Sequence, residues 1–336
     1  MLALNNRTPF AAERTFVRDK SGADLWVVAV KATYSIQEDG SLILADEQLP
    51  PCLAPVYWGD PGISSIRYEG DLTLPKPATD VLVNGSAHAP HGRVVSELAV
   101  RLRIGNIDKT LRVQGPRFYR ETAWGVRADA PQPFATLPIR YELAYGGTDL
   151  SAPDPARHRA DMRNPIGAGF AVEDSALIGR PALSITYPDG DPAKAGPAGF
   201  GAIASYWSPR LEKGGTYDDA WAANQRPLLP SDWDDTCLLC APPDQRVGGY
   251  LRGDETIELT HLSPQADLRL QLPRTVLGFN THFGSTIQSH RGRLVTVVVE
   301  PDDGRVLLVW QTALRVPLRM IDHLDQTDIF VKRLVS

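Results

Sequence analysis

Two cysteines, Cys237 and Cys240, are the residues whose type and spacing most resemble a metal-binding or redox site. A C-x-x-C pair forms half of a zinc ribbon or the redox centre of a thioredoxin-like domain, but each needs further residues. No second Cys or His pair follows at a matching distance, Cys52 stands alone, and no strand–helix–strand pattern surrounds the pair. The sequence therefore favours two small buried side chains here, and it predicts neither a metal site nor a cofactor.

Histidines and carboxylates form two further groups with possible ligand chemistry. His88 and His91 lie in an irregular proline-containing segment, which is a poorly preorganised setting for a shared metal ion. Asp232, Asp234 and Asp235 crowd one segment, but the glycine and terminal glutamate of an EF-hand do not follow. We interpret the histidines as solvated or hydrogen-bonded, and the aspartates as an acidic turn.

Aromatic side chains gather in a loop-rich part of the chain, at Trp207, Tyr217, Trp221 and Trp233. Aromatic residues on loops often anchor a partner's side chains at protein interfaces. Large aromatics also cover the underside of long loops as small satellite cores. The sequence leaves both interpretations open for each of these residues.

Alternation of apolar and polar residues predicts the strands that must position these groups. Residues 97–104 alternate strictly and lead through a turn to a second alternating segment near Leu111 and Val113, which predicts a hairpin. Residues 294–299 and 306–310, joined by a Pro-Asp-Asp-Gly turn, predict another hairpin. Residues 25–34 are apolar on both faces, which is typical of a central strand.

Helical periodicity is scarce, with one short helix predicted at residues 218–225, while residues 321–335 fit either a helix or a strand. Residues 146–235 are rich in Gly, Pro, Asp and Ser, which predicts long surface loops, and loops of that length usually bind something. We therefore expect a mainly β fold, an antiparallel β-sandwich or barrel-like architecture, two-lobed, with long loops and few short helices.

The expected organisation is an N-terminal β lobe over residues 1–150, a loop-rich connecting region over 151–235, and a C-terminal β lobe over 236–336. One continuous fold is the alternative. The length of 336 residues permits either arrangement.

The net charge and the hydropathy of the sequence limit the classes of partner that the protein is expected to bind. The formal charge of -5 gives no source for the counterion-release attraction that drives nucleic-acid binding. No apolar run approaches the roughly 20 residues that span a bilayer, and the first residues do not form a secretory signal. Three cysteines suit a reducing compartment. We expect a cytoplasmic protein that binds neither nucleic acid nor membrane.

Several unusual sequence segments occur together across most of the chain. They are residues 70–77, 79–85, 140–147, 164–167, 201–210, 215–218, 225–227 and 250–255, together with Trp221, Pro230 and Asp232. As a set they resemble a bacterial domain of unknown function that is encoded beside VgrG and PAAR spike proteins, and the resemblance covers roughly residues 15–310.

This resemblance implies an adaptor or chaperone that binds a type VI secretion effector, a toxin, by its N-terminal region and promotes its loading onto the VgrG/PAAR spike. Members of this family are not known as enzymes, and none of the residues is carried over as catalytic. The residues implied as contacts with the effector are Trp207, Tyr217, Trp221, Asp232 and Trp233.

Two alternatives stay open. The first is a carbohydrate-active or other hydrolytic β-sandwich enzyme in which Asp232 and Glu255 act as acid and base. The second is a structural part of the spike that is secreted with it.

Overall fold

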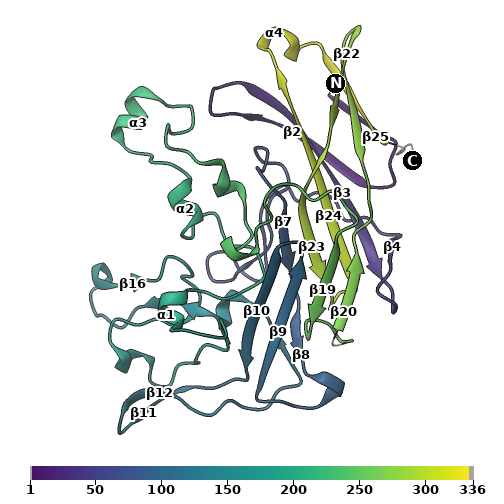
Figure 1. Ribbon diagram of the computed structural model, residues 1–336. Coiled ribbons are helices and arrows are strands. Elements are labelled where there is room, and N and C mark those ends of the chain that lie inside the picture. Colours follow the sequence, from purple (N-terminus) through teal and green to yellow (C-terminus); the bar gives the residue numbers. More distant parts are fainter. Residues whose placement is uncertain (1, 266, 333–336) are drawn as a thin grey trace.

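A computed structural model describes residues 2–265 and 267–332. The chain is mainly β, with few short helices, as the sequence predicted. Figure 1 shows the long strands on one side of the molecule and the loop-rich segment, coloured teal to green, on the other. Among the described residues, no helix is both long enough and apolar enough to cross a membrane.

A six-stranded sheet forms the centre of the fold, in the order β2-β3-β24-β23-β7 with β4 also paired to β3. Its strands are β2 (Ala11–Arg18), β3 (Asp24–Ile36), β4 (Leu42–Leu44), β7 (Asp80–Val83), β23 (Arg293–Glu300) and β24 (Arg305–Val316). β3 lies between β2 and β24, and residues 26–34 are buried, which confirms the central strand predicted at 25–34. The predicted hairpin at 294–310 is also confirmed, as β23 and β24.

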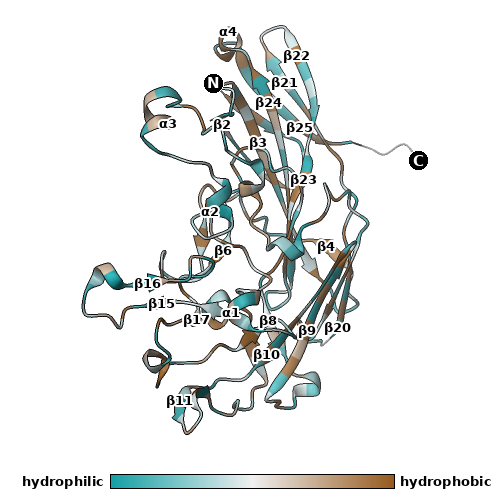
Figure 2. Cartoon of the chain, turned by 60° about the vertical axis from the view of Figure 1, so that its left-hand side comes forward, coloured by the Kyte–Doolittle hydropathy of each residue, from teal (hydrophilic) through white to brown (hydrophobic). Residues whose placement is uncertain are grey.

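A five-stranded sheet has the order β18-β10-β9-β19-β20. Its strands are β9 (Glu97–Ile104), β10 (Ile107–Gln114), β18 (Ile185–Thr186), β19 (Thr256–Thr260) and β20 (Asp267–Gln271). The predicted hairpin is confirmed as β9 and β10, and Gly105 in its turn has φ of 55°, a conformation that glycine adopts readily. Every second residue of β9 is buried, and Figure 2 shows hydrophobic and hydrophilic residues alternating along β9 and β20.

Buried side chains of the two sheets belong to one continuous hydrophobic core, which includes Val30 of β3, Val298 of β23, Leu102 of β9 and Leu259 of β19. All strand pairs in these sheets are antiparallel except β23 with β7. The arrangement is sandwich-like, and the sheets of the described residues do not close into a barrel.

A four-stranded sheet, β1-β25-β21-β22, joins the two ends of the chain. Its strands are β1 (Ala3–Asn6), β21 (Leu277–Phe283), β22 (Thr286–Arg291) and β25 (Leu324–Val331). The ambiguous segment at 321–335 is thus mostly the strand β25, which follows the short helix α4 (Leu318–Ile321). Residues 333–335 of that segment lie outside the described residues.

Each of the three sheets combines strands from residues 1–150 with strands from residues 236–336. The remaining elements are short. Short strands form five two-stranded sheets, which are β5 (Val56–Tyr57) with β6 (Ile66–Tyr68), β8 (Ser86–His88) with β13 (Thr136–Pro138), β11 (Tyr119–Thr122) with β12 (Gly125–Ala128), β14 (Tyr145–Gly146) with β17 (Ala168–Gly169), and β15 (Thr148–Asp149) with β16 (Arg159–Ala160).

The predicted loops at 146–235 are largely irregular. They contain the short helices α1 (Pro192–Ala195), α2 (Arg210–Lys213) and α3 (Asp219–Asn224), and a 3-10 turn, η5 (Asp235–Leu238), follows them. The predicted helix at 218–225 is confirmed as α3, since Asp218 caps it by accepting a hydrogen bond from the Trp221 N–H at 2.8 Å.

Candidate functional site

Four of the five residues implied as contacts lie on one loop platform built from α2, α3 and η5. Tyr217 and Trp221 meet edge-to-face with ring centroids 4.7 Å apart, and Tyr217 is 54% exposed. Trp233 is half-buried, and its indole N–H donates to Asp235 Oδ1 at 2.8 Å. We call Leu211, Tyr217, Trp221, Trp233 and Leu238 the aromatic loop surface.

The carboxylate of Asp232 is engaged in hydrogen bonds within the platform and is not free to bind a partner. Its Oδ1 accepts from the Thr216 N–H at 3.0 Å and its Oδ2 from the Thr216 hydroxyl at 2.7 Å. These two hydrogen bonds to Thr216 lower the pKa of Asp232. Next to them Gly215 has φ of 81°, and a Cβ there would lie 2.7 Å from Pro230 Cβ. Both features fix the loop that carries Tyr217.

A hollow of about 360 Å³ opens on the aromatic loop surface, lined by Tyr217, Trp233, Leu211 and Leu238. Its lining also includes an ion pair, Arg210 Nη1 to Glu69 Oε2 at 2.6 Å, whose side chains are only 5% and 11% exposed. Burial opposes the charge of Arg210, but Glu69 outweighs it and the pKa of Arg210 is raised. The hollow therefore offers aromatic and aliphatic walls beside a neutralised charge pair, which suits an apolar side chain better than a charged one.

Trp207 is a correction to the predicted set. Its side chain is 1% exposed and its ring packs edge-to-face on Tyr141, with centroids 5.6 Å apart. The indole is thus part of the hydrophobic core and is not available to a partner. It supports the loop that leads into α2, because the Leu211 N–H donates to the Trp207 carbonyl at 2.9 Å.

A second buried pair anchors the far end of the platform to the central sheet. Lys76 Nζ lies 2.8 Å from Asp80 Oδ2, and Asp80 also accepts from the N–H groups of Cys240 and Ala241 at 3.1 and 2.9 Å. Burial opposes ionisation of Asp80, but Lys76 and these N–H groups lower its pKa. The sequence revealed neither pair. Arg210 and Glu69 are 141 residues apart, and Lys76 and Asp80, although only four residues apart, lie in a segment with no periodic pattern that shows their burial.

Cys237 and Cys240 are both buried free thiols, as the sequence indicated. Burial raises the pKa of Cys237 to about 11 and raises that of Cys240 further, so both stay protonated and unreactive at neutral pH. Within residues 2–265 and 267–332, no three His, Cys, Asp or Glu side chains gather closely enough to hold a metal ion.

The histidine and carboxylate groups have ordinary structural roles. His88 Nε2 lies 2.7 Å from Asp302 Oδ1, and His91 is exposed to solvent. Asp234 accepts from Lys213 Nζ at 2.8 Å and caps η5 through the Thr236 N–H. These contacts confirm hydrogen-bonded or solvated histidines and an acidic turn.

Asp232 and Glu255 do not form a pair of catalytic carboxylates around one described hollow. Neither residue lines the 360 Å³ hollow. Asp232 has a lowered pKa, whereas a general acid needs a raised one. Glu255 Oε1 accepts from the Arg252 N–H at 2.8 Å, so it serves the backbone of its own turn.

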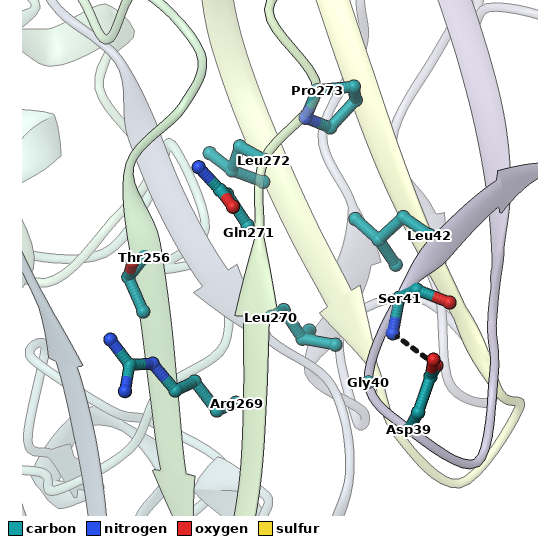
Figure 3. Close-up of a pocket in the computed structure, with 10 residues that line it drawn as sticks. All are labelled: Asp39, Gly40, Ser41, Leu42, Thr256, Arg269, Leu270, Gln271, Leu272 and Pro273. Atoms are coloured by element: carbon teal, nitrogen blue, oxygen red, sulfur yellow. Dashed lines mark hydrogen bonds between the residues drawn. The ribbon is translucent and has the colours of Figure 1, made fainter.

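A larger hollow, of about 580 Å³, lies between the turn at residues 39–42 and the edge strand β20. Figure 3 shows that its two titratable side chains, Asp39 and Arg269, lie on opposite sides, and that Asp39 accepts from the Ser41 N–H. No nucleophile and base meet among the residues drawn. The aromatic loop surface is therefore the better candidate for a binding site.

The family model described as "Uncharacterized protein conserved in bacteria (DUF2169)" matches residues 21–311. The chain belongs to this family. The DUF2169 match includes the whole aromatic loop surface, both buried ion pairs and the strands from β3 to β23. No curated protein and no solved structure matches the chain.

Proposed function

We propose that this DUF2169 protein is a cytoplasmic adaptor that binds a type VI secretion effector through the aromatic loop surface and promotes its loading onto the VgrG/PAAR spike. The observation that carries the proposal is the hollow in which Tyr217 and Trp233 present their rings from a loop that Asp232 holds closed. The family resemblance of the sequence segments at 207–210, 215–218 and 250–255 indicates the class of partner, a type VI secretion effector.

The physics of the site supports recognition by shape. Aromatic anchors that are already held in place lose little conformational entropy when a partner binds. Tyr217 is half-exposed and Trp221 is fixed by its indole N–H, which donates to the Leu228 carbonyl at 2.9 Å. An apolar segment from the N-terminal region of the effector would bury its side chain in the hollow and leave the covalent chemistry of both proteins unchanged.

Binding of the effector's folded or partly folded state would stabilise that state by mass action. An interface of modest area would still permit release at the spike. The role needs no catalytic group and no cofactor from the adaptor.

The test is co-expression of the effector with this chain and with the VgrG and PAAR proteins of the same host. We expect the chain to raise the soluble fraction of the effector and to increase the amount of effector recovered with VgrG. Unchanged solubility together with unchanged recovery on the spike would contradict the proposal. Recovery of the chain itself in the culture fluid with the spike would favour a secreted structural part.

A further inference from the structure

Two adjoining hollows lie where β22 ends and β23 begins. Their volumes are about 440 and 470 Å³, and both are lined by Tyr250 and Arg293. We call these two hollows together the arginine groove, because their lining includes Arg252, Arg274, Arg291 and Arg293. None of these residues belongs to the aromatic loop surface.

The positive charge of the arginine groove is only partly neutralised within the described part of the chain. Arg252, Arg291 and Arg293 make no ion pair there, and all three are exposed. Arg274 has a single acidic neighbour, Asp254, at 3.6 Å, and both side chains of that pair are more than half exposed. A cluster of this kind stands out in a chain whose formal charge is -5.

Part of the groove is held in place before any ligand arrives. The Arg293 guanidinium lies over the Tyr250 ring, 4.7 Å from its centroid, and the Tyr250 hydroxyl donates to the Lys76 carbonyl at 2.5 Å. Stacking of this kind fixes the plane of a guanidinium that can then donate two parallel hydrogen bonds to a carboxylate.

The floor of the 440 Å³ hollow is apolar. Leu251, Val276, Leu294 and Trp310 line it, and Leu294 and Trp310 are almost fully buried. A ligand that fills this hollow must carry both carboxylates and an apolar group.

We propose that the arginine groove binds an acidic segment of another polypeptide that carries an apolar side chain. The carboxylates of that segment contact the arginines, and its apolar side chain covers the floor of the 440 Å³ hollow. Nucleic acid fits less well, because four arginines on a negatively charged chain give a short basic cluster rather than a track along a phosphate backbone. This surface is separate from the aromatic loop surface, and the proposal does not depend on the adaptor role.

The test uses the purified full chain and a fluorescently labelled octapeptide of alternating glutamate and leucine, followed by anisotropy. We expect saturable binding that weakens when salt rises from about 0.05 M to about 0.3 M. R291E/R293E should weaken binding at least about tenfold, because it places like charges opposite the ligand. R127E/R157E makes the same change of charge at two exposed arginines outside the groove and should bind as the unmodified chain does.

Thermal unfolding of both double variants checks that they fold, and their midpoints should match that of the unmodified chain. Absence of saturable binding by the unmodified chain would overturn the proposal. So would an equal loss in R127E/R157E, equal binding of a peptide with lysine in place of glutamate, or tighter binding of single-stranded DNA than of the acidic peptide.

Discussion

The central sheet and the loop platform are held by different forces. Strands β3, β23 and β24 are continuous ladders whose inner side chains are almost fully buried, so backbone hydrogen bonds and apolar burial hold them together. The platform has no ladder, and it is fastened by Arg210–Glu69, Lys76–Asp80 and the Asp232–Thr216 bonds. The difference teaches that a few polar contacts, two of them buried ion pairs, fix this loop surface, so that each contact matters individually.

Of the substitutions considered, loss of the Asp80 carboxylate should lower the free energy of unfolding the most. Asp80→Ala leaves the Lys76 ammonium buried without its partner and two N–H groups without an acceptor. We expect a loss of about 3–5 kcal/mol in the free energy of unfolding, measured by urea denaturation.

Asp108→Ala is the matched control, because it removes a carboxylate that pairs with Arg101 at 2.5 Å while both side chains are about half exposed. Its cost should be much smaller than that of Asp80→Ala, because solvent screens an exposed ion pair. Equal losses in the free energy of unfolding for the two variants would contradict the larger contribution that we assign to the buried Lys76–Asp80 pair.

Acid should destabilise the four-stranded sheet through protonation of His290 in β22. Burial lowers the pKa of His290 to about 4, and its ring nitrogens bond to the hydroxyls of Thr281 and Thr312 at 2.8 and 2.7 Å. The unfolded chain binds this proton more tightly, so the stability contributed by neutral His290 is present above about pH 6.5 and is lost as pH falls towards 4.

This loss should reach about 3 kcal/mol, measured as the free energy of unfolding across that pH window. H290Q should remain folded and lack this component of the pH dependence. A pH profile of H290Q with the same slope as the unmodified chain would show that other groups carry the effect.

Gly215→Ala should strain the platform locally. The position has φ of 81° and an added Cβ would meet Pro230, so we expect a loss of about 1–2 kcal/mol and weaker effector binding. Gly248→Ala places its Cβ in open space and should change neither stability nor binding. Identical behaviour of the two alanine variants would count against a strained, fixed loop.

Sequence patterns predicted the sheet well, because burial on alternate residues leaves a periodic signal. The hairpin at 97–114 was found in this way, whereas the hairpin predicted at 294–310 and the central strand β3 were found from apolar runs, because these strands are buried on both faces. The parallel pairing of β1 with β25 and the sharing of all three sheets by both ends of the chain left no such signal, because strand order depends on contacts distant in sequence.

The site was predicted only in part. Aromatic residues in a loop-rich segment indicated a surface, but loops have no periodicity that tells an inward ring from an outward one, and Trp207 proved to be buried. The exposed Trp124, at the tip of the β11–β12 hairpin, was missed for the same reason. The sequence did not reveal the arginine groove, because the four arginines that line it are spread from residue 252 to residue 293.

The most direct test of the account is the affinity of the effector's N-terminal region for the unmodified chain and two variants, measured by isothermal titration calorimetry. Y217A/W233A removes the two rings that line the hollow, and we expect Kd to rise at least about tenfold with an unchanged unfolding midpoint. W124A removes a tryptophan that is 86% exposed outside the platform, and its Kd should equal that of the unmodified chain. An unchanged Kd for Y217A/W233A would contradict recognition by the aromatic loop surface.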